Sequence, residues 1–82
     1  MNYVALTERL IKALASNPDM VTVKEFPSDD ENKVLIEVLV DSSDLPRIIG
    51  KNGKNINAIR TILKASSSLH DRKFITLNVE SF

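Results

Sequence analysis

Two glycines three positions apart, Gly50 and Gly53, lie near the start of the one stretch whose residue types indicate a ligand site. The stretch covers residues 47–64 and reads RIIGKNGKNINAIRTILK. It has no acidic residue, although the 82-residue chain has 11 acidic and 11 basic residues. Its five basic residues are Arg47, Lys51, Lys54, Arg60 and Lys64. Such a local excess of positive charge indicates a site for an anion.

The loop between the two glycines has the properties of a phosphate site. Glycine reaches positive φ without steric cost, and the missing Cβ lets another backbone come close. A helical pattern starts directly after Gly53, so the unpaired N–H groups at the start of that helix would face the loop. Lys51 and Lys54 add full charges, and Asn52 adds a neutral donor. We therefore predict that the anion is the backbone of a nucleic acid.

The spacing of apolar residues predicts the elements that must hold this loop. We expect strands at residues 20–26, 34–40 and 73–80. The expected helices are residues 3–16, a short helix from Ser42 or Ser43 to about Ile49, and one from about Lys54 to a turn within 65–68. Asn2 is the expected N-cap of the first helix, and the pair Asn17-Pro18 is expected to stop it.

The order of these elements predicts an α+β fold of the form α-β-β-α-α-β. The first two strands are joined by a short polar loop and should pair antiparallel. The third follows a two-helix crossover and should lie parallel to the second. We expect three helices on one face of this mixed sheet, because that arrangement buries both apolar patterns.

Composition excludes several other classes of protein. There is no cysteine and only one histidine, His70, which lies in a polar turn, so a structural zinc site is not expected. The P-loop and dinucleotide-binding glycine patterns are missing, so we predict no enzyme, no cofactor and no small-molecule substrate. No segment approaches the ~20 apolar residues of a membrane span. The expectation is one cytoplasmic domain over residues 1–82, with no metal and no membrane partner.

Charge is divided unevenly along the chain. Residues 1–44 hold four basic and nine acidic residues, a net charge of −5, and residues 45–82 hold seven basic and two acidic residues, a net charge of +5. This division predicts one electropositive face on an otherwise acidic body.

Residues 48–56, IIGKNGKNI, resemble the signature of KH domains. In that signature an apolar residue and an isoleucine precede Gly-x-x-Gly, and a second isoleucine follows three positions after it. The element order resembles the type II KH arrangement. Over essentially all of its length the chain is similar to the small bacterial single-KH proteins of the KhpA type.

The resemblance implies a type II KH domain whose Gly-x-x-Gly loop clamps about four nucleotides of single-stranded RNA. It implies that Ile48, Ile49 and Ile56 lie in the core or on the groove floor, and helical spacing favours the core for Ile56. It also implies a homodimer, or a heterodimer with a larger Jag-type KH protein, and roles in RNA chaperoning, post-transcriptional regulation and cell-shape control. The RNA-binding residues expected by position are Gly50, Lys51, Asn52, Gly53, Lys54, Arg47, Arg60, Lys64 and Ile49.

Three points stay open at this stage. The acidic loop at residues 28–31 would repel phosphates if it faced the groove. Phe74 and Phe82 could stack on bases, although packing or a dimer surface is the favoured role for Phe74. The alternative function is a protein-interaction module with a KH-like fold and no nucleic-acid ligand, in which Leu35, Leu39 and Phe74 on the open sheet face would form the interface.

Overall fold

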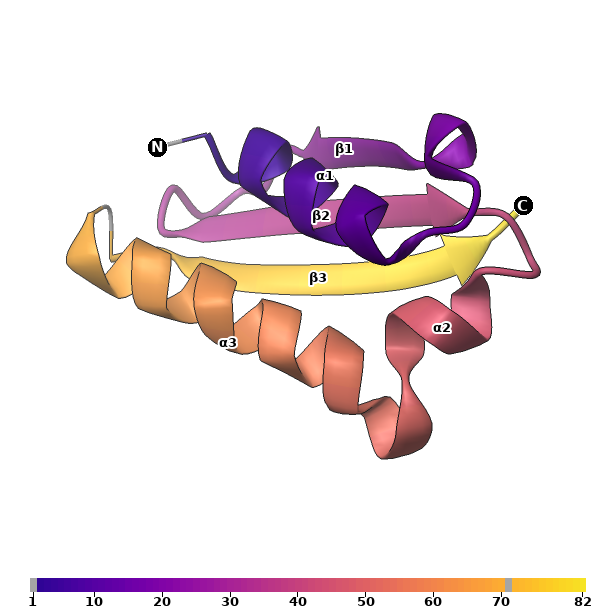
Figure 1. Cartoon of the computed structure of the whole chain (residues 1–82). Coiled ribbons are helices and arrows are strands. Elements are labelled where there is room, and N and C mark those ends of the chain that lie inside the picture. The colour runs from indigo at the N-terminus through magenta and orange to yellow at the C-terminus, as the bar shows by residue number, and fades with distance from the viewer. Residues whose placement is uncertain (1, 71) are drawn as a thin grey trace.

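A computed structural model describes residues 2–70 and 72–82 of the chain. Figure 1 shows a small sheet with helices packed against it. The elements, in chain order, are α1 (Tyr3–Leu14), the 3₁₀ turn η1 (Pro18–Met20), β1 (Thr22–Phe26), β2 (Lys33–Val40), α2 (Leu45–Ile49), the 3₁₀ turn η2 (Lys51–Gly53), α3 (Lys54–Leu69) and β3 (Phe74–Ser81). In the described part of the chain, no helix is long and apolar enough to cross a membrane.

The three strands form one mixed sheet in the order β1-β2-β3. β1 pairs antiparallel with β2, and β3 pairs parallel with β2, with Ile36 opposite Leu77. Alternate residues of β2 are buried on the face that the helices cover, and Leu35 and Leu39 lie partly exposed on the other. The core joins this face to all three helices through Tyr3, Ile11, Ile48, Ile56, Ile59 and Leu63. The predicted α+β class, strand pairing and position of the helices are confirmed.

The end of α3 differs from its prediction. Residues 65–68 were expected to form a turn, but α3 continues through the serines to Leu69. The reason is Ser67, which is 1% exposed and whose hydroxyl accepts a hydrogen bond from the Lys73 N–H at 2.8 Å and donates one to the Lys73 carbonyl. Serine has a low helix propensity, but here a tertiary contact outweighs it. The last turn of α3 therefore lies beside the start of β3.

Asp44 fixes the start of α2, and therefore the position of the loop that follows. Ser42 or Ser43 was expected to cap this helix; the N-cap is instead Asp44, whose side chain makes no capping bond. Its buried carboxylate accepts hydrogen bonds from the backbone N–H groups of Ser16, at 3.0 Å, and Asn17, at 2.8 Å. The expected serine cap was wrong because this carboxylate is needed to join α2 to the end of α1.

Replacing Asp44 by asparagine should lower the melting temperature at neutral pH by several degrees. The pKa of Asp44 lies below its ordinary 3.8, chiefly because the Ser16 and then the Asn17 backbone N–H groups stabilise the carboxylate. A lowered pKa in the folded state adds stability above the unfolded pKa, and this stability is lost as the pH falls through the folded value. Thermal melts between about pH 7 and pH 2 should therefore show a smaller acid-induced loss for Asp44→Asn than for the parent. Equal losses in both proteins would contradict this role.

Candidate nucleic-acid interface

Three residues with positive φ turn the chain between α2 and α3. Gly50 has φ 78° and ψ 170°, Asn52 has φ 57°, and Gly53 has φ 75° in the left-handed region. The conformation of Gly50 is one that essentially only glycine adopts. A Cβ on Gly50 would also lie 2.8 Å from Cγ and 2.9 Å from the backbone N of Asn55. The first glycine is therefore required by both conformation and packing.

Asn55 holds the two helices together at this turn. Its side-chain amide donates a hydrogen bond to the carbonyl of Arg47 at 2.8 Å, and its Cβ and Cγ fill the space where Gly50 has no side chain. The role of Asn55 was not predicted, because it depends on the angle between α2 and α3, which hydrophobic periodicity does not define. Arg47 itself is exposed on α2.

The tip of the loop presents donors and positive charge to solvent. Lys51, Asn52 and Lys54 are exposed. No side chain caps the N-terminus of α3, and the N–H of its first residue, Lys54, donates to the carbonyl of Lys51. Within residues 2–70 and 72–82, neither Lys51 nor Lys54 makes an ion pair. An uncapped helix start beside two free ammonium groups is a suitable site for a phosphate.

A groove of about 460 Å³ opens beside this loop, between α3 and β3. Ile49, Gly53, Ile56, Asn57 and Arg60 form its helix wall, and Asn78, Val79 and Glu80 of β3 form the opposite wall. Ile56 is 4% exposed, as expected of a core residue, and Ile49 is half-buried. Polar and apolar groups therefore face each other across a cleft that leads away from the positive loop.

Asn57, Asn78 and Glu80 in this groove were not predicted. The two strand residues lie on the outer edge of the sheet, where their side chains face the groove only because β3 lies beside α3. Strand alternation alone does not show that this edge of the sheet borders the loop. The amide and carboxylate groups of these three residues can donate to or accept from the edges of bases.

Arg60 bridges the two walls at the far end of the groove. Its Nε and Nη2 donate to the carbonyl of Leu77 at 3.3 Å and 3.0 Å, and its Nη1 donates to Oδ1 of Asn57 at 3.1 Å. Three of its five N–H groups are thus used within the protein. Arg60 was expected to add positive charge to the site; its geometry gives it a structural task as well.

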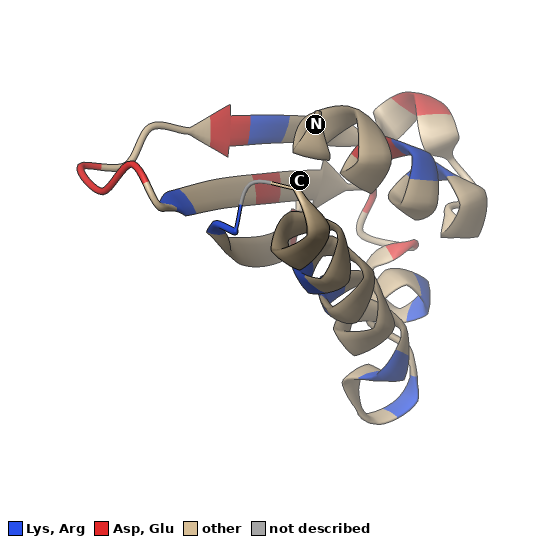
Figure 2. Cartoon of the chain, turned by 90° about the vertical axis from the view of Figure 1, so that its left-hand side faces the viewer, with Lys and Arg blue, Asp and Glu red and all other residues tan. Residues whose placement is uncertain are grey.

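The other predicted basic residues do not line this groove. Lys64 lies one turn beyond Arg60 and borders a second hollow, and Arg47 lies on α2. Figure 2 shows that α2, the loop and α3 carry Lys and Arg and no acidic residue. The acidic loop at residues 28–31 lies at the start of β2, at the opposite end of the sheet from Gly50–Gly53 (Figures 1 and 2). Its carboxylates therefore do not border the groove.

No catalytic or metal centre was found in the part of the chain that the structure describes. No cluster of three or more His, Asp or Glu side chains there could hold a metal ion. His70 lies exposed at the C-terminal end of α3.

Comparison with known proteins gives consistent results along the chain. Residues 5–79 match the model of the family described as KhpA/KhpB, KH domain. The RNA-binding protein KhpA of Thermotoga maritima is 34% identical over 74 residues, which cover 90% of this chain and 93% of that protein. The RNA-binding protein KhpA of Aquifex aeolicus is 42% identical over 60 residues, or 73% of each chain.

A solved structure shares the fold. The crystal structure of Era in complex with MgGDPNP and nucleotides 1506–1542 of 16S ribosomal RNA superposes with a TM-score of 0.70 and 24% sequence identity. The superposition covers 98% of this chain and 30% of that one. The chain thus corresponds to less than a third of the length of that protein.

Proposed function

Because the chain belongs to the KhpA/KhpB family of KH domains, we propose that it binds single-stranded RNA in the groove between the Gly50–Gly53 loop and β3. The observation that carries this proposal is the loop itself, with two positive-φ glycines, two lysines that make no ion pair among the described residues, and the start of α3 at the mouth of a groove. Membership of this family also confirms the prediction that the chain is not an enzyme.

The parts of the site have separate tasks in this proposal. Gly50 and Gly53 let the RNA backbone approach, and Lys51, Asn52 and Lys54 bind its phosphates. Ile49 offers an apolar surface to the bases above the buried Ile56, and Asn57, Asn78 and Glu80 contact the edges of the bases. Arg60 fixes the distance between the two walls through its hydrogen bonds to β3. Its two remaining N–H groups can donate to the ligand.

A single strand fits this site better than a duplex. The groove lies between a helix and a strand edge, so bases can enter only when they are unstacked and turned away from a pairing partner. A duplex presents mainly its phosphates to the protein, and phosphates make no favourable contact with the apolar side chains of the helix wall.

A binding titration tests the proposal. We expect an unstructured single-stranded RNA of about ten nucleotides to bind, with a Kd that rises as salt is increased from 50 to 200 mM. Each phosphate contact should add roughly 0.7 to the slope of log Kd against log salt concentration. A duplex of the same length should bind at least tenfold more weakly, because it cannot place bases in the groove. Equal affinity for the duplex, or no binding of either RNA, would overturn the proposal.

The finer parts of the proposal follow from the family. We propose that residues 1–82 form a single cytoplasmic KH domain that acts as an RNA chaperone or post-transcriptional regulator, with a link to cell-shape control. We also propose that it works as a homodimer or with a larger Jag-type KH protein. Two exposed apolar side chains seven residues apart on α3, Ile62 at 43% and Leu69 at 82%, support a protein partner on that helix.

A further inference from the structure

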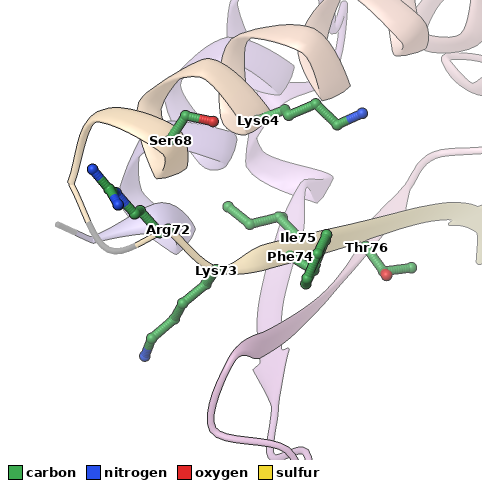
Figure 3. Close-up of a pocket in the computed structure, with 7 residues that line it drawn as sticks. All are labelled: Lys64, Ser68, Arg72, Lys73, Phe74, Ile75 and Thr76. Atoms are coloured by element: carbon green, nitrogen blue, oxygen red, sulfur yellow. The ribbon is translucent and has the colours of Figure 1, made fainter.

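Beyond Arg60, the seam between α3 and β3 opens into a second hollow of about 680 Å³. Its walls are Lys64 and Ser68 of α3 and residues 72–76, which lead into and begin β3. Figure 3 shows Ile75 pointing from β3 toward α3, with Lys64 and Arg72 on either side of the opening. This hollow lies on the same edge of the sheet as the first groove, because residues of α3 and β3 line both, and the two elements run in opposite directions (Figure 1).

The lining of this hollow combines positive charge with an exposed aromatic ring. Three of the seven lining residues, Lys64, Arg72 and Lys73, are basic, and none is acidic. In the described residues, none of the three makes an ion pair. Phe74 is 71% exposed and Ile75 forms an apolar floor. A basic channel beside an aromatic side chain is the combination that binds single-stranded nucleic acid by phosphate contact and base stacking.

The backbone that presents these side chains is held in place. Ser67 binds both the N–H and the carbonyl of Lys73, and the N–H of Arg72 donates to the Ser67 carbonyl at 2.6 Å. Arg72 has φ 55°, a left-handed conformation that an L-residue keeps only where its surroundings hold it. The start of β3 is thus ordered before any ligand arrives, which lowers the entropic cost of binding there.

We propose that this hollow is a second nucleotide subsite, which rests on the proposed function and extends the RNA path past Arg60. Lys64 and Arg72 would bind a phosphate, and Phe74 would stack on a base. α3 advances about 15 Å from Lys54 to Lys64, so only a strand that continues along the seam from the Gly-x-x-Gly loop can reach the subsite. The RNA strand then follows the α3–β3 seam from the loop to the C-terminal end of α3.

Charge on the neighbouring surface favours this path. Asp29 lines a separate hollow on the open face of the sheet, which shares Thr76 with the basic one. Lys33 lines that hollow too, but the three carboxylates of Asp29, Asp30 and Glu31 outnumber it, so a phosphate would be attracted instead by Lys64 and Arg72 on the α3 side. The acidic loop therefore confines the strand to the seam and does not block the site near Gly50.

The test compares RNA length with a double variant, Arg72→Asn with Phe74→Ala. Asparagine tolerates the left-handed backbone of Arg72, so the change removes the charge without added strain. For an RNA of about ten nucleotides we expect the Kd to rise roughly tenfold or more, since one lost stacking contact alone is worth about that factor. For an RNA of about four nucleotides, the length that the loop clamps, we expect less than about a twofold change.

The control variant is Arg9→Gln with Phe26→Ala, which removes one cation and one partly exposed aromatic from α1 and β1, away from the seam. It should bind both RNAs like the parent, and thermal melts should show that both variants are folded.

The following outcomes would contradict the proposed subsite. Parent-like binding of the long RNA by the double variant, or equal weakening of both lengths, would show that the hollow holds no nucleotide. A variant that binds RNA normally but changes from dimer to monomer in light scattering would make the hollow a protein interface. Failure of the parent to bind either length would instead overturn the proposed function, and the subsite with it.

Discussion

Replacing Lys51 and Asn52 together by aspartate should raise the Kd for single-stranded RNA by at least about 100-fold, while the melting temperature stays within about 3 °C of the parent value. Both side chains are exposed and neither residue belongs to the core, so we expect their replacement to leave the fold intact. The change removes one positive charge and adds two negative charges at the point where phosphates would lie. Fluorescence anisotropy with a labelled RNA, together with circular dichroism melts, measures both quantities.

The matched control carries the same change of three charges on α1. Arg9→Glu with Lys12→Gln alters exposed side chains outside the groove and uses residues that favour helix. We expect this variant to lose less than about fivefold in affinity, since distant exposed charges are largely screened. Equal losses in the two double variants would mean that RNA responds to net charge, and the loop would not be a clamp.

Replacing Gly50 by alanine should destabilise the domain by roughly 3 kcal/mol, which lowers the melting temperature by roughly 15 °C. The new Cβ would meet the backbone and side chain of Asn55 within 3 Å, in a backbone region that alanine does not adopt. Relief requires the start of α3 to move, which would break the bond from Asn55 to the Arg47 carbonyl. Thermal or urea unfolding measures the loss.

Gly53→Ala is the comparison that separates the two glycines. A Cβ at Gly53 would lie 3.4 Å from the side-chain nitrogen of Asn57, which can rotate away. The remaining cost is that of a left-handed alanine, about 1–2 kcal/mol. Equal destabilisation by the two substitutions would contradict the geometry of the turn described above.

Local patterns in the sequence were sufficient to predict the architecture of the domain. The nearly continuous apolar run at residues 34–40 and the alternation at residues 73–80 predicted both strands, because these patterns do not depend on distant contacts. The loop was recognised for a similar reason, since its glycines and lysines lie within five consecutive positions. The segments whose structure differed from the prediction are those in which a hydrogen bond to a residue outside the segment determines the local structure. Examples are the bonds between Ser67 and Lys73 and between Asp44 and Ser16.

The walls of the groove could be predicted only in part. Ile49 and the loop lie on one continuous stretch of chain, whereas Asn78 and Glu80 come to the groove from the last strand. Their position depends on which edge of the sheet α3 covers, and sequence periodicity does not define that edge. Arg60 and Lys64 looked equivalent in sequence, yet one binds the Leu77 carbonyl and the other lies free in the next hollow.

The contact of Arg60 with Leu77 also affects how the sheet can associate. β3 is an outer strand, and an outer strand offers unpaired carbonyl and N–H groups to any other extended chain. The guanidinium group of Arg60 donates two hydrogen bonds to the Leu77 carbonyl in the middle of that strand. The helix α3 packs against the same strand. A second chain that tried to extend the sheet here would have to displace a charged bidentate donor first. Arg60 therefore protects the domain against edge-to-edge aggregation and keeps this edge accessible to bases.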